Sequence, residues 1–86
     1  MKKFQLIIAT PTGKVFDDKI TQISIMGECG SLSILADHIP FITNVKDGSC
    51  RIYTETDILE CTSTGGILSV TKDCARLITT SFEINK

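Results

Sequence analysis

The chain has 86 residues, enough for one domain with one hydrophobic core, so we expect residues 1–86 to form a single unit. Nine Lys and Arg face ten Asp and Glu, and the net charge of -1 excludes the basic surface that nucleic acids require. The N-terminal apolar run stops at Thr10-Pro11, too short for a signal peptide, so we expect a chain that is neither exported nor inserted in a membrane.

Composition and turn spacing predict β-strands along the whole chain. Ile, Val and Thr make up 27 of the 86 residues, and branched side chains favour extended backbone over helix. In chain order the turn signals are Thr10-Pro11-Thr12-Gly13, Asp17-Asp18, Gly27 to Gly30, Asp37 to Pro40, Asp47-Gly48, Glu55 to Asp57, Gly65-Gly66 and Lys72-Asp73. About nine short strands fit between them, and several alternate with period two. This pattern predicts two antiparallel layers closing on one core, with no long helix.

The four cysteines are predicted to be free thiols, and Cys50, Cys61 and Cys74 fall inside strand-like segments, which favours burial in the core. Cys29, Cys50, Cys61 and Cys74 form no C-x-x-C pair, and His38 is the only histidine, so a metal site is not expected. Without a secretion signal we expect a reducing compartment, where cysteine behaves as a small hydrophobe.

No motif in the chain predicts catalysis or a cofactor. Gly13-Lys14 lacks the second glycine and the following Ser or Thr of a phosphate loop, and reads as a turn. His38 beside Asp37 lacks the glycine-rich elbow that presents a nucleophile. Gly65-Gly66 is followed by no helix that would bind an anion, so a turn or bulge is expected there.

Charge is depleted between Ile20 and Val45. These 26 residues carry only Glu28 and Asp37, whereas the 19 charges of the whole chain would predict between five and six. The strand at 20–26 is expected to be core. From Gly27 to Phe41 the Gly, Pro and Asp residues indicate loops that retain apolar side chains, a combination that favours a docking surface.

The stretch from Gly27 to Pro40, GECGSLSILADHIP, resembles the signature of the F-type ATP synthase epsilon subunit. Further segments resemble that family in the right order: Thr10–Phe16, Asp47–Ile52 and Gly65–Val70, followed by Leu77. The resemblance covers essentially the whole chain. It implies a flattened antiparallel β-sandwich of nine to ten short strands at the foot of the rotor. The lack of a transit peptide favours a bacterial source.

The resemblance also implies partners and a place in the cell. The domain would hold the gamma subunit and the c-ring, transmit torque without catalysis, and stay at the cytoplasmic face of the plasma membrane through those partners. By position, the gamma surface would comprise Thr10, His38, Ile39, Pro40, Phe41, Ile42 and Thr43. The c-ring surface would comprise Glu28, Cys29, Gly30 and Ser31.

The sequence departs from the family pattern in two respects. Family members often carry an acidic residue where this chain has Ser31 and a glycine where it has Ser33. Many also continue into a C-terminal helical hairpin that restrains ATP hydrolysis, but this sequence ends at Lys86, so that activity is not expected. The rival interpretation is a free-standing β domain that binds a ligand or hydrolyses one with Cys29 and His38.

Overall fold

The computed structural model describes residues 2–37 and 39–85, and this part of the chain forms ten β-strands without a helix, so none that could cross a membrane. The all-β class and the nine to ten strands are therefore confirmed. The strands are β1 Phe4–Thr10, β2 Gly13–Ile20, β3 Gln22–Gly27, β4 Gly30–Leu35, β5 Phe41–Val45, β6 Gly48–Tyr53, β7 Ile58–Ser63, β8 Gly66–Val70, β9 Cys74–Thr79 and β10 Phe82–Ile84.

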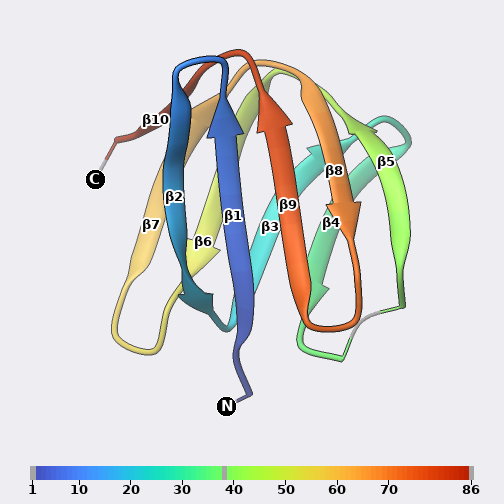
Figure 1. The fold of residues 1–86 in the computed structure, drawn as a ribbon, viewed down its shortest axis with the longest axis vertical. Coiled ribbons are helices and arrows are strands. Elements are labelled where there is room, and N and C mark those ends of the chain that lie inside the picture. The colour runs from blue at the N-terminus through green and yellow to red at the C-terminus, as the bar shows by residue number, and fades with distance from the viewer. Residues whose placement is uncertain (1, 38, 86) are drawn as a thin grey trace.

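The strands form two layers joined at one corner (Figure 1). The front layer has the order β5-β8-β9-β1-β2, and the back layer has the order β10-β7-β6-β3 with β4 on the free side of β3. Gly27 of β3 pairs with Val45 of β5, which links the layers into one sheet. Every pairing is antiparallel except that of β1 with β9, which lies between two antiparallel neighbours.

The core lies between the layers because alternate side chains of each strand point inward. Along β1 the buried residues are Phe4, Leu6 and Ile8, and the residues between them are more exposed. Along β9, Ala75 and Leu77 are buried in the same alternating way. Cys50 and Cys61 lie opposite each other across β6 and β7 and belong to this core. All four cysteines are free thiols, two of them buried.

Two expectations of strand and loop placement were wrong. Asp17-Asp18 is not a turn, because β2 runs through it as a terminal strand paired only with β1, where charged side chains reach solvent. The stretch after Gly27 is not mainly loop, because β4 forms a hairpin with β3. Ile34 of β4 is buried and Leu32 packs against the core, so these apolar residues contribute to the hydrophobic core of the domain.

Candidate docking surface

The outer face of the front layer carries a cluster of isoleucines. Ile67 of β8 lies opposite Ile78 of β9, which in turn lies opposite Ala9 of β1. Ile42 of β5 and Ile7 of β1 lie in the neighbouring row of the same face, with Ser69 and Arg76 between them. Ile42, Ile67 and Ile78 are 73%, 48% and 61% exposed. We call Ile7, Ala9, Ile42, Ile67 and Ile78 the isoleucine face, which makes this surface the candidate docking surface of the chain.

Two hollows lie on either side of Ile78. One has a volume of about 330 Å³ and is lined by Ile7, Ala9, Lys14, Arg76, Leu77 and Ile78. The other has a volume of about 350 Å³ and is lined by Thr10, Pro11, Gly65, Gly66, Ile67, Ile78, Thr79 and Thr80. A projecting side chain between two mainly apolar hollows suits an interlocking contact with a partner's side chains.

Charged groups form one rim of this face. Lys14 Nζ lies 2.9 Å from Asp17 Oδ2, and Gln5 Nε2 donates to Asp17 Oδ1. The hydrogen bond from Lys14 lowers the pKa of Asp17. The isoleucine face thus has a polar rim on its β2 side, as protein interfaces usually do.

The outer face of the back layer is different, because it is mainly polar. Ser24 Oγ and Ser33 Oγ lie 3.3 Å apart across β3 and β4, and the guanidinium of Arg51 lies 3.9 Å from the carboxylate of Glu60.

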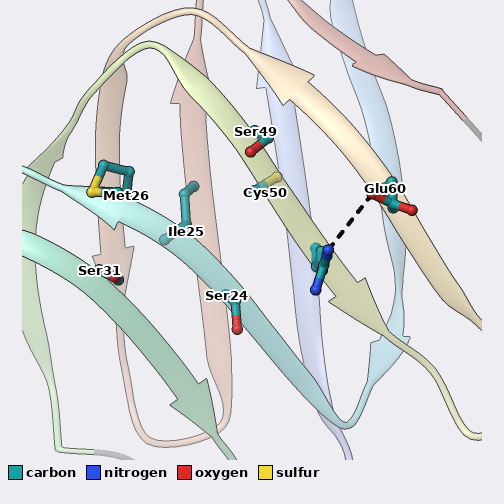
Figure 2. A pocket seen from close by; sticks show the side chains of 8 residues that line it. Ser24, Ile25, Met26, Ser31, Ser49, Cys50 and Glu60 are labelled. Atoms are coloured by element: carbon teal, nitrogen blue, oxygen red, sulfur yellow. Dashed lines mark ion pairs between the residues drawn. The ribbon is translucent and has the colours of Figure 1, made fainter.

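A hollow of about 210 Å³ opens where β3 and β6 diverge; its lining comes from β3, β4, β6 and β7 (Figure 2). The lining residues are Ser24, Ile25, Met26, Ser31, Ser49, Cys50, Arg51 and Glu60. Burial raises the pKa of the Cys50 thiol to about 12, so this thiol stays protonated and is a poor nucleophile.

The β3–β4 hairpin places the expected c-ring residues at its tip. Gly27 pairs with Gly30 around a two-residue turn, and Gly30 has φ 133°, which favours glycine. Glu28 and Cys29 form the turn and are exposed, as is Ser31. Asn44 Nδ2 donates to Glu28 Oε2 at 2.8 Å, and Glu28 N donates to Asn44 O at 3.0 Å. The tip is therefore held against β5 rather than projecting alone.

The expected gamma-surface residues do not form a single cluster. Ile42 belongs to the isoleucine face, and Thr10 lines the hollow beside it. Phe41 and Thr43 lie opposite buried Val70 and Leu68, so they point towards the core. Ile39, 81% exposed, and Pro40 lie just before β5, at the far end of the layer from Thr10. His38 lies outside the described residues.

The sequence analysis missed Ile7, Ile67 and Ile78. A signal for them was present, because Ile7-Ile8, Ile67-Leu68 and Leu77-Ile78 are adjacent apolar pairs inside strands. Neighbouring residues of a strand point to opposite faces, so such pairs indicate a sheet that is apolar on both sides.

The fold is a small all-β sandwich whose front layer has an outer face rich in exposed isoleucines and whose back layer has a mainly polar one. Within residues 2–37 and 39–85 no three His, Cys, Asp or Glu side chains gather as a metal site. The chain belongs to the family of the ATP synthase delta/epsilon chain, beta-sandwich domain, whose model matches residues 3–85.

The curated relatives agree with this family. The ATP synthase epsilon chain of Mycoplasmopsis pulmonis is 34% identical over 86 residues, covering 98% of this chain and 61% of the relative. The sodium ion specific epsilon chain of Acetobacterium woodii is 41% identical over 68 residues, covering 78% of this chain and 51% of the relative. The chain thus spans less than two thirds of the length of these relatives.

Solved structures share the fold. A chain in the Euglena gracilis mitochondrial ATP synthase assembly with OSCP, F1 and c-ring matches with a TM-score of 0.89 at 15% identity, covering 95% of this chain and 53% of that one. A chain in the central stalk and c-ring structure of Tetrahymena thermophila mitochondrial ATP synthase matches with a TM-score of 0.80 at 14% identity, covering 95% and 66%.

Proposed function

We propose that this chain is a central-stalk subunit of a bacterial F-type ATP synthase that couples proton or sodium flow to ATP synthesis. It acts as a docking element without catalysis of its own, held at the cytoplasmic face of the plasma membrane by its partners. Family membership and the names of the relatives support this role. The observation that carries the proposal is the isoleucine face, in which Ile42, Ile67 and Ile78 of one layer are 73%, 48% and 61% exposed.

In this proposal the front layer binds the gamma subunit. Thr10 ends β1 at one end of the layer, while Ile39 and Pro40 precede β5 at the other. The isoleucine face lies between them, so a single partner lying along the layer would cover all these residues. Phe41 and Thr43 would act indirectly, by holding β5 in place from the core side.

The hairpin tip from Glu28 to Ser31 binds the polar loops of the c-ring. The tip is exposed, and its bonds to Asn44 keep it in a fixed position relative to the front layer. A rigid connection between the two contacts is what a torque-transmitting part needs. A crosslinker attached to the exposed Cys29 should label the c-ring in an assembled complex, whereas labelling confined to other subunits would refute this placement.

The gamma contact is tested by titrating purified gamma subunit with the chain in a calorimeter. Full burial of an isoleucine side chain is worth about 1.5–3 kcal/mol. Ile78 is 61% exposed, so burying that part is worth about 0.9–1.8 kcal/mol, and Ile78→Ala should raise the dissociation constant about 5- to 20-fold. Met26→Ala, on the outer face of the back layer and 41% exposed, is the matched control and should bind like the unmodified chain. If Met26→Ala weakens binding and Ile78→Ala does not, the wrong face has been assigned.

The rival reading, a ligand-binding domain or a hydrolase using Cys29 and His38, gains no support from the described residues. Cys29 lies at the exposed hairpin tip and lines none of the three hollows described above. Rapid alkylation of Cys29 that is lost in His38→Ala would favour the rival over the docking role.

A further inference from the structure

Strand β4 leaves one edge of the back layer open. It pairs with β3 along its whole length, and among the residues that the structure describes no strand pairs with its other edge. An open edge presents backbone N–H and C=O groups to any extended chain that approaches.

The hydrogen bonds of β3 identify which groups of β4 are free to bind. Lys46 N donates to Met26 O at 3.0 Å, so the even-numbered residues of β3 direct their backbone groups towards the side of β5 and β6. The odd-numbered residues of β3 bond with β4 instead, and their partners there are its even-numbered residues. The odd-numbered residues of β4 therefore direct N–H and C=O outward: Ser31, Ser33 and Leu35.

The sheet has two other terminal strands, β2 and β10, and both have features that hinder pairing with another chain. Strand β4 has none of these features. Strand β2 has charged residues along its length and a register shift opposite Ile8 and Ala9. Strand β10 has only three residues, one of them Glu83. Charge, bulges and shortness are the usual protections of a sheet edge. Strand β4 has six residues, no charge, and an unbroken register with β3.

We propose that β4 pairs antiparallel with β4 of a second copy of this chain, so that two back layers become one continuous sheet. With Ser33 opposite the second copy's Ser33, Leu32 lies opposite Ile34 on the core side, and Ser31 lies opposite Leu35 on the outer side. All three outward-directed residues of each strand then exchange their N–H and C=O groups.

The identity of the occupant follows from this chemistry. The edge suits an uncharged strand that alternates apolar and hydroxyl-bearing side chains, and β4 itself is uncharged and has that alternation from Ser31 to Ile34. The same pattern already satisfies β3, where Leu32 faces Ile25 and Ser33 faces Ser24. Symmetric pairing brings no like charges together, which would be costly in a cross-strand pair. The inference concerns the chain outside the rotor and does not depend on the gamma contact.

The test is sedimentation equilibrium of the 86-residue chain from micromolar to millimolar concentration. We expect a monomer–dimer equilibrium, and Ser33→Pro should raise its dissociation constant at least about tenfold because proline removes an outward N–H without touching the β3 ladder. Ser33→Lys should have a similar effect through like-charge repulsion, which covers the case in which the proline variant does not fold. Ser33→Thr keeps the N–H and should dimerise normally.

A further variant separates this edge from the apolar face. Ile78→Lys should leave dimerisation unchanged, because Ile78 lies on the other layer. A chain that stays monomeric at every concentration would overturn the proposal, as would a dimer abolished by Ile78→Lys and untouched by Ser33→Pro and Ser33→Lys.

Discussion

Gly66 starts β8 at a point where a side chain has no room. A Cβ added there would lie 2.0 Å from the carbonyl oxygen of Ile78, a backbone atom of the neighbouring strand. Real contacts do not fall below 3.0 Å, so β8 and β9 would have to separate by about 1 Å. Because backbone in the middle of a sheet yields poorly, Gly66→Ala should cost about 3 kcal/mol, the upper end of the usual penalty for overpacking.

Thermal and urea unfolding followed by circular dichroism would measure this cost. At about 4–8 °C per kcal/mol for a domain of this size, the melting temperature should fall by roughly 12–24 °C. The adjacent Gly65→Ala is the matched control, since its Cβ would lie 2.9 Å from Val45 O and 3.1 Å from the movable Asp47 carboxylate. It should cost about 1 kcal/mol. A Gly65 variant as unstable as the Gly66 variant would refute the steric reasoning.

Three further predictions concern buried groups. Burial raises the pKa of Cys50 from 9.0 to about 12. The thiol therefore ionises first in the unfolded chain, and its contribution to the free energy of unfolding is fully present below pH 9.0. As the pH rises towards 12, the free energy of unfolding should fall by up to about 1.4 kcal/mol per pH unit. Urea unfolding between pH 8 and 10 should show a smaller decline for Cys50→Ala, and an equal decline would contradict the assignment. Native iodoacetamide treatment should modify Cys29 rapidly and Cys50 and Cys61 only after unfolding, as mass spectrometry of digests can establish. Thr79 is 4% exposed and its hydroxyl donates to Thr64 O at 2.7 Å, so Thr79→Val should lower the free energy of unfolding by about 1–2 kcal/mol; an unchanged urea midpoint would show that the hydrogen bond contributes nothing.

The sequence predicted the strands well and their partners poorly. β-branched residues and turn signals are local properties, and they placed the hairpin turn near Gly27 to Gly30 and the turn at Asp47-Gly48 where the structure has them. The pair Asp17-Asp18 was wrongly predicted to be a turn. Adjacent charges would interrupt a central strand, but a terminal strand such as β2 can direct them into solvent. The parallel pairing of β1 with β9 joins segments about 70 residues apart, and no local pattern encodes such a contact.

The candidate site was only partly predictable for a similar reason. Charge depletion drew attention to Gly27–Phe41, but Leu32 and Ile34 are apolar because they pack against the core. Ile42 lies next to this stretch and does belong to the exposed face. Ile67 and Ile78 come from strands far along the chain, and composition cannot say which layer leaves its outer side uncovered.

The contrast between the two layers bears directly on the proposed docking role. A two-layer sandwich needs one apolar face on each layer, and the back layer largely follows this rule, with serines, Arg51 and Glu60 on its outer side. Its exposed apolar residues, Met26, Leu35 and Ile58, come from three different strands. The front layer breaks the rule, because apolar residues occupy both faces of β8 and β9. A sheet of that kind is normally the middle of three layers. The partner that binds the isoleucine face would then supply the third layer, and the exposed side chain of Ile78 between its hollows would fix how the two surfaces fit together.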